Sequence, residues 1–181
     1  MPEPDIEPPR GQLLAVGEAL IDFIVADDAT DLASANVFGA RPGGAPANVA
    51  VALARLGLPA AFAGAVGHDP FGRRLASTLV AEGVDVSRLS FHGRETSLAF
   101  AWKTSSGDGR FWLLRGADLE LSASDMENAG VDRLGALIVG SVALSGEPSR
   151  SAIIRGVELA AAAGIPVCFD VNLRQSLWPN P

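Results

Sequence analysis

The chain has 181 residues, of which 48% are hydrophobic and 19% are charged, and its mean hydropathy is +0.26. This length and composition are typical of one globular domain with a hydrophobic core, and they exclude a disordered chain. The net charge of −7 and the pI near 4.7 argue against a surface that binds nucleic acid or anionic membranes, because such surfaces are basic.

The sequence also carries signals about location. Residues 1–11 are acidic and rich in proline, which predicts a disordered tail rather than a signal peptide. No stretch approaches the roughly 18 continuous apolar residues of a membrane-spanning helix. We therefore expect a soluble, cytoplasmic protein. The single cysteine, Cys168, lies in an apolar run and cannot form an internal disulfide, so we expect a buried thiol.

The first part of the chain alternates short apolar runs with helical patterns. Strands are predicted over residues 13–16, 20–25 and 60–66, and helices over residues 47–56 and from Asp69 to Gly83. Asp69-Pro70 is typical of an N-cap followed by a proline in the first turn. Glycines at 57 and 83 are typical of the residue that ends a helix.

The middle of the chain has a different character. Residues 96–104 and 110–115 are β-type runs, and the segment between them is Ser-Ser-Gly-Asp-Gly. This pattern predicts a β-hairpin. Because the hairpin interrupts the alternation of strands and helices, we expect it to belong to a small additional sheet.

Alternation resumes after the hairpin. Ser122 and Asp125 approximate a capping box for a short helix. Further elements are predicted as a strand over 136–139, a helix over 148–163 with Ile153, Ile154, Val157 and Ala161 facing inward, and a strand over 166–169. Repeated strand–helix units predict a parallel sheet covered by helices, which is a three-layer α/β fold.

Residues 42–48 read Pro-Gly-Gly-Ala-Pro-Ala-Asn, directly before a helical pattern. The pair Gly43 and Gly44 predicts a turn that side chains would obstruct. Pro46 suits the first helical position, and Asn48 then falls in the first turn. There its amide can face a small polar ligand together with free backbone N–H groups. A plain turn is the alternative interpretation.

Other polar residues lie where strands end, and ligands of open α/β sheets bind beyond the carboxyl ends of strands. Asp22 interrupts an apolar stretch, and a buried carboxylate needs partners or a ligand. Sugar hydroxyls would satisfy it, although a helix cap or a solvated turn is the alternative. Asp170, Asn172 and Arg174 share one side if the chain stays extended. This set suits a phosphate or metal–phosphate region, or else a structural salt bridge.

Several familiar motifs do not occur in this sequence. It has no Gly-x-x-x-x-Gly-Lys-Ser/Thr loop, no Gly-x-Gly-x-x-Gly after the first strand and no Gly-x-Ser-x-Gly elbow. Cysteine and histidine residues do not cluster, so we expect no metal site.

Together, the segments of this chain resemble the ribokinase-like (PfkB) carbohydrate kinases, and among them the fructokinases. The resemblance runs from about residue 13 to the last residue, in the order and spacing of the family. Its segments are Gly17-Glu18 with Asp22, residues 42–48, residues 64–72, Arg-Gly-Ala-Asp at 115–118, Gly140-Ser141, residues 169–174 and residues 177–179.

The resemblance implies a ribokinase-like αβα fold with a small β lid, of which residues 12–181 form the N-terminal part. It places the lid in residues 34–41 and 95–116, closing over the sugar and joining two subunits in a homodimer. It also assigns roles to single residues. Sugar binding falls on Asp22, Gly43, Gly44, Asn48 and Arg115, and the phosphate side of the site falls on Asp170, Asn172 and Arg174.

The family's catalytic base lies in a Gly-Ala-Gly-Asp motif, and an Asn-x-x-Glu motif supports magnesium. Neither motif occurs here. We therefore expect the catalytic residues beyond Pro181 and no turnover by these 181 residues alone. The whole protein is expected to phosphorylate a sugar, foremost fructose to fructose 6-phosphate, with ATP and Mg²⁺. The alternatives are a kinase for ketodeoxygluconate or a riboside, and a shortened, non-catalytic sugar-binding or interaction protein. A dinucleotide oxidoreductase has only the general α/β pattern in its favour.

Overall fold

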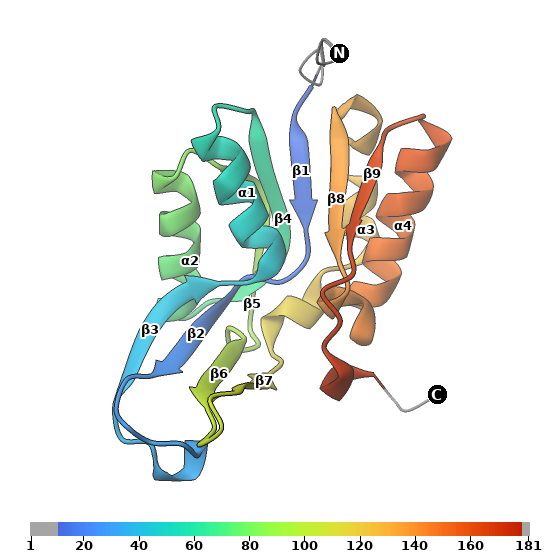
Figure 1. The fold of residues 1–181 in the computed structure, drawn as a ribbon. Helices are drawn as coiled ribbons and strands as arrows, with labels where there is room; N and C mark the ends of the chain where they lie inside the picture. Colours follow the sequence, from blue (N-terminus) through green and yellow to red (C-terminus); the bar gives the residue numbers. More distant parts are fainter. Residues whose placement is uncertain (1–10, 179–181) are drawn as a thin grey trace, which may run out of the picture.

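The computed structural model describes residues 11–178, so the predicted tail lies outside the described residues except for Gly11. Two sheets organise the chain (Figure 1). The central sheet is parallel, in the order β5-β4-β1-β8-β9. Its strands are β1 (Leu13–Val16), β4 (Ala60–Gly67), β5 (Asp85–His92), β8 (Ala136–Gly140) and β9 (Val167–Asp170).

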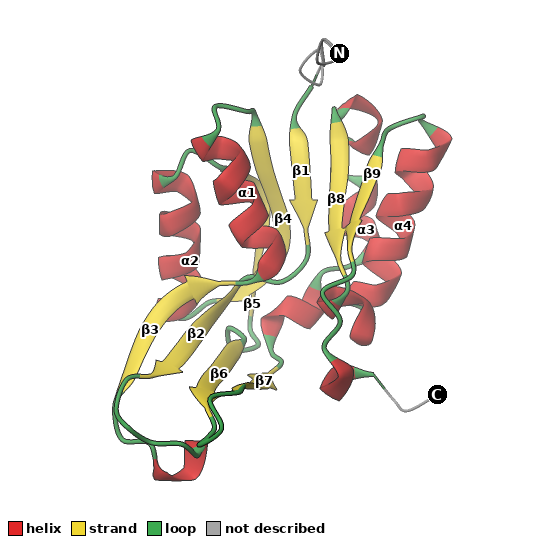
Figure 2. Cartoon of the chain, viewed as in Figure 1, coloured by secondary structure: helices red, strands yellow, loops and turns green. Residues whose placement is uncertain are grey.

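Helices cover both faces of the central sheet (Figure 2). They are α1 (Ala45–Arg55), α2 (Pro70–Ala81), α3 (Ala123–Glu127) and α4 (Ser149–Ala162). Phe62 of β4 packs with α1 and α2 in one core, whereas Leu14 of β1 packs with α3 and α4 in the other. All eight residues of β4 are buried, as expected for a parallel strand with helices on both faces. The predicted three-layer α/β fold is therefore confirmed.

The predicted helix signals act as expected. The Asp69 carboxylate accepts hydrogen bonds from the backbone N–H groups of Phe71 and Gly72, both at 2.8 Å, and caps α2. Ser122 and Asp125 form the expected capping box of α3. Helix α1 begins at Ala45, so Pro46 is its second residue rather than its first.

The second sheet, which we call the lid sheet, has the order β3-β2-β6-β7. Its strands are β2 (Leu20–Val25), β3 (Phe38–Gly43), β6 (Leu98–Lys103) and β7 (Gly109–Leu114). The predicted hairpin is β6 and β7, which pair antiparallel. In Figure 1 the arrows of β1 and β8 point toward the lid sheet, which places it beyond the carboxyl ends of these strands.

The structure differs from the sequence analysis in three respects, one concerning a strand and two concerning the burial of side chains. The strand β5 was not predicted because it has no continuous apolar run and because the adjacent polar residues Ser87 and Arg88 break the alternation of apolar and polar residues. In α4, Ile153 faces the core as expected, but Ile154 is 48% exposed and Ala161 is also exposed. Cys168 is exposed rather than buried. The reason for this last error is that, within residues 11–178, β9 pairs with β8 alone and all four of its residues are exposed.

In the described part of the chain, no helix combines the length and the apolar character needed to cross a membrane.

Candidate functional site

A pocket of about 280 Å³ lies where the loop after β1, the start of α1, the lid sheet and the segment after β9 meet. This volume is close to the lower end of the range for small-molecule sites. The polar side chains that line the pocket are Glu18, Asp22, Asn48, Asn172 and Arg174. The structure therefore brings together residues that are more than 150 positions apart in the sequence.

Asp22 enters the pocket from β2 of the lid sheet, where it lies opposite Arg41 of β3 and Ala99 of β6. Its side chain is half-buried, and this burial raises the pKa of the Asp22 carboxyl above its ordinary value. The positive charge of Arg174 opposes the rise. A carboxylate and a guanidinium thus face one small space, the first as a hydrogen-bond acceptor and the second as a donor.

The glycine pair is required by the two acidic residues of this site. A Cβ atom on Gly43 would collide with the Asp22 carboxylate. Gly44 has φ +105°, and a Cβ atom there would collide with the carbonyl oxygen of Glu18. Any side chain at either position would displace the loop after β1 or the carboxylate of Asp22. Gly44 itself lines the pocket. Gly43 does not line it, but the lack of a side chain at Gly43 leaves room for the Asp22 carboxylate, which does.

Asn48 lies in the first turn of α1 and lines the pocket. Its backbone N–H donates to the carbonyl oxygen of Gly44 at 2.9 Å, as in a regular helix. Only the side-chain amide of Asn48 is therefore free for a ligand. The amide offers both donors and an acceptor, which suits a polyhydroxylated molecule.

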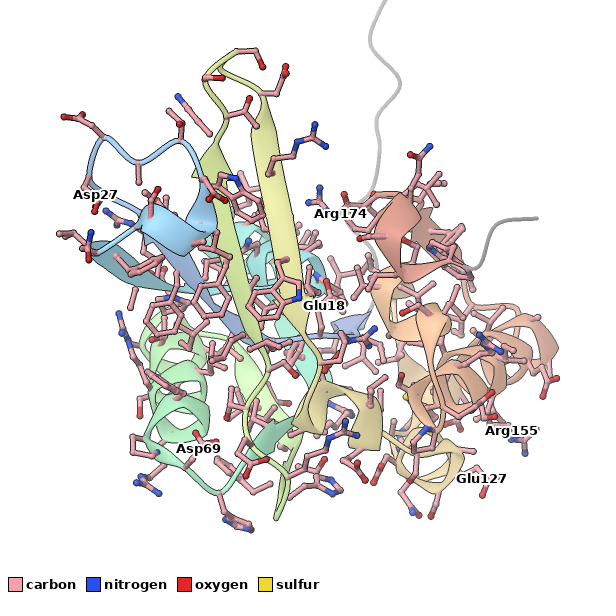
Figure 3. All side chains as sticks on the ribbon, turned by 90° about the horizontal axis from the view of Figure 1, so that it is seen from below. Glu18, Asp27, Asp69, Glu127, Arg155 and Arg174 are labelled. Atoms are coloured by element: carbon pink, nitrogen blue, oxygen red, sulfur yellow. The ribbon has the colours of Figure 1, made fainter. Side chains whose placement is uncertain are left out.

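The segment after β9 closes the pocket on another side. The strand ends at Asp170, and the N–H of Asn172 donates to the Asp170 carboxylate at 3.1 Å. The chain therefore turns here instead of staying extended, and Asn172 and Arg174 line the pocket while Asp170 does not. The Arg174 guanidinium lies 4.8 Å from the ring centre of Phe111 on β7, a cation–π contact with the lid sheet (Figure 3).

Arg115, like Gly43, is a predicted sugar-binding residue that does not line this pocket. It follows β7, and its Nε donates to the buried Asp118 carboxylate at 2.6 Å. Its Nη1 donates to the Ser145 hydroxyl at 2.6 Å and to the carbonyl oxygen of Val142 at 3.2 Å. Arg115 thus connects the base of the lid sheet to the loop after β8.

Glu18 is a pocket residue that the sequence analysis did not assign to the site. Its side chain is only 3% exposed, and burial raises its pKa to about 7. The sequence signal was present: a single glutamate follows Gly17 inside an otherwise apolar stretch from residue 13 to 21. A carboxyl buried there needs a partner, as was argued for Asp22.

A larger groove of about 760 Å³ lies between α1, α2 and β3. Gly43 and Asn48 reach it, but most of its lining is the apolar and arginine side chains of the two helices. Arg55 and Glu82 on its rim already pair with each other at 2.6 Å. The smaller pocket is therefore the better candidate site, because it collects polar groups without such partners.

Among the described residues, no group of three or more His, Cys, Asp or Glu side chains could hold a metal ion. Asp170 and Asn172 are bonded to each other by the turn described above.

Comparisons with known proteins agree with this architecture. The rice protein fructokinase-1 (Oryza sativa subsp. japonica) is 42% identical over 171 residues, which are 93% of this chain and 53% of that protein. A fructokinase from Xylella fastidiosa with bound ATP superposes with a TM-score of 0.83 at 33% identity, covering 94% of this chain and 55% of that one. An uncharacterized sugar kinase from Pyrococcus horikoshii superposes with a TM-score of 0.86 at 32% identity, covering 93% and 55%.

The chain spans about half the length of the curated relatives that it matches. The model of the pfkB family of carbohydrate kinases matches residues 10–180, which is nearly the whole chain. The resemblance inferred from the sequence motifs is therefore confirmed: this chain belongs to the pfkB carbohydrate kinase family.

Proposed function

We propose that the whole protein transfers the γ-phosphoryl group of ATP to a primary hydroxyl of a sugar, foremost fructose to give fructose 6-phosphate. In this proposal the described residues supply the sugar-binding half, and the protein acts as a homodimer joined through the lid sheet. The observation that carries the proposal is the pocket of about 280 Å³, in which Asp22, Asn48 and Arg174 converge under the lid sheet. Family membership supports the reaction type.

The chemistry of the pocket suits a neutral polyol next to a transferring phosphoryl group. The Asp22 carboxylate can accept hydrogen bonds from two neighbouring hydroxyls, and the Asn48 amide can donate and accept. Arg174 lies in the segment after β9 and lines the pocket, where its charge can stabilise phosphate oxygens. Phe111 and Leu113 of the lid sheet add apolar walls that exclude water.

ATP and Mg²⁺ enter the proposal as the phosphoryl donor and the metal of the reaction. Solved relatives hold ATP, among them the Xylella fastidiosa fructokinase. The part of the chain that the structure describes holds no group of three or more His, Cys, Asp or Glu side chains that could bind a metal ion. Apolar side chains exposed on the lid sheet, such as Ile24 and Trp112, are the surface that the proposed homodimer would cover.

The test of sugar binding is Asp22→Asn in the whole protein, compared with Asp132→Asn. Both changes remove one carboxylate charge, but Asp132 lies on the surface with its side chain 68% exposed. Loss of the charge-assisted hydrogen bonds should weaken the affinity for fructose about 10- to 150-fold in Asp22→Asn only. Isothermal titration calorimetry measures this effect. Unchanged affinity in a folded Asp22→Asn variant would remove Asp22 from the site.

A second test addresses the phosphate side. Arg174→Ala in the whole protein should lower kcat more than it weakens the affinity for fructose, because negative charge on the phosphoryl group is what Arg174 would stabilise. Arg133→Ala is the control, since that side chain is 76% exposed. Steady-state kinetics with fructose and magnesium-ATP measure the difference. If kcat is normal and only the melting temperature falls, Arg174 acts as a structural residue.

A further inference from the structure

Glu18 is a buried acid in the pocket to which the proposed function assigns no role. It lies between β1 and β2, near the centre of the molecule in Figure 3. Its Oε1 accepts a hydrogen bond at 3.1 Å from the N–H of Ala45, the first residue of α1. Its Oε2 is buried, and no described residue offers it a hydrogen bond. Buried polar atoms in folded proteins nearly always have a partner, so an unpaired oxygen beside a pocket points to a ligand or a water molecule.

Glu18 lines the pocket together with Asp22, Asn48 and Arg174. Gly140, which ends β8, lies close to Oε2: a Cβ atom placed there would lie 4.0 Å from Oε2 and 3.2 Å from Cγ of Pro46. A side chain at position 140 would therefore crowd both Oε2 and Pro46.

The charges around Glu18 decide which hydrogen bonds it can make. Burial raises its pKa to about 7, while the N–H groups of Glu18 itself and of Ala45 oppose the rise. Asp118 raises the pKa further and Arg115 lowers it, and the charged groups Asp22 and Arg174 line the same pocket. Below this pKa the carboxyl keeps its proton, and its free oxygen is then a donor. Asp22, by contrast, accepts hydrogen bonds when ionised.

We propose that Glu18 is a further ligand-binding residue of this pocket, whose Oε2 forms a hydrogen bond with a hydroxyl group of the bound sugar. The inference rests on the proposed function, because it takes the ligand to be a sugar. A donor at Glu18 and an acceptor at Asp22 bind a sugar from two sides. A site of this kind discriminates strongly against an analogue that lacks the hydroxyl, since the buried polar group is then left unpaired.

The experiment measures by calorimetry the affinity of the whole protein for fructose and for its monodeoxy analogues. The variants are Glu18→Met, which has a similar shape but makes no hydrogen bond, and Glu18→Gln, which keeps a donor and an acceptor. For wild type, one deoxy analogue should bind about 10- to 100-fold more weakly than fructose. Glu18→Met should bind fructose as weakly as that analogue and should no longer distinguish the two. Glu18→Gln should retain most of the affinity and the discrimination.

The outcomes separate this inference from the proposed function. If Glu18→Met weakens every sugar by the same factor, Glu18 acts only through the start of α1 or holds a water molecule, and the inference is overturned while the proposed function stands. If wild type binds none of the sugars, both are overturned. If Glu18→Met does not fold, the affinity of wild type for fructose should still change between pH 6 and pH 8, whereas that of Glu18→Gln should not. An equal pH response in both proteins would overturn the inference.

Discussion

Asp118→Ala should lower the free energy of unfolding by about 3 to 5 kcal/mol, which is a large fraction of the stability of an ordinary domain. Asp118 is 1% exposed, and its carboxylate accepts hydrogen bonds from Arg115, the Ser97 hydroxyl and the N–H of Gly116. The truncation leaves the Arg115 guanidinium, whose side chain is 13% exposed, without its counter-charge. Urea unfolding of the 181-residue protein measures the loss.

The control for this prediction is Glu127→Ala, which removes an exposed ion pair with Arg155 at 3.0 Å. Exposed pairs contribute about 1 kcal/mol or less, so this variant should be close to wild type. The double variant Arg115→Ala/Asp118→Ala should lose less than the two single variants combined, because neither charge is then left alone. Equal and small losses in Asp118→Ala and Glu127→Ala would show that the buried pair does not hold the base of the lid sheet.

Glu18→Gln should become more stable relative to wild type as the pH rises from 4.5 to 7, by about 3 kcal/mol in total. The pKa of Glu18 is raised from 4.5 to about 7 in the folded protein. Between these values the folded state holds a proton that the unfolded state has released, so the stability of wild type falls as the pH rises. About one pH unit above 7, where Glu18 is ionised in both states, the difference should level off. Glutamine carries no titrating proton and removes this dependence.

Urea unfolding at pH 4.5, 6, 7 and 8 checks the prediction as the difference between the two proteins, in which the contributions of the other groups cancel. Glu127→Gln is the control, because that side chain is 53% exposed. The effect of Glu127→Gln on stability should be much smaller than that of Glu18→Gln at pH 8. A difference for Glu18→Gln that does not vary with pH would mean that burial does not raise the pKa of Glu18 in the folded protein.

Much of the architecture could be predicted from local sequence signals. Asp69-Pro70 and Gly83 mark the start and the end of α2, and the Ser-Gly-Asp-rich segment marks the β6–β7 hairpin. These signals are local because capping and turn formation depend on residues a few positions apart. The order of the motifs likewise identified the carbohydrate kinase family.

Other features depended on contacts between distant segments. Apolar character alone predicted that Cys168 and Ile154 are buried, yet both lie where the sheet ends at β9 and no described element covers them. The polar composition of Asp85–His92, in which Ser87-Arg88 breaks the alternation, gave no clear signal for β5, an edge strand that forms by pairing with β4. Whether an apolar residue is buried depends on what packs over it, and a local pattern does not contain that information.

Some residues of the candidate site could likewise be indicated from the sequence, whereas the placement of others depended on the tertiary structure. The sequence by itself singled out Asp22, the glycine pair and Asn48 one by one, because an isolated carboxylate, turn geometry and helix starts are local signals. The resemblance to the carbohydrate kinases then assigned them to one site. Only the tertiary structure decided that Arg174 faces Asp22 across the pocket, that Asp170 and Arg115 do not line it, and that Glu18 does. The physical reason is that these arrangements depend on where the lid sheet and the segment after β9 close on the central sheet. Those distances arise from the packing of segments far apart in the chain.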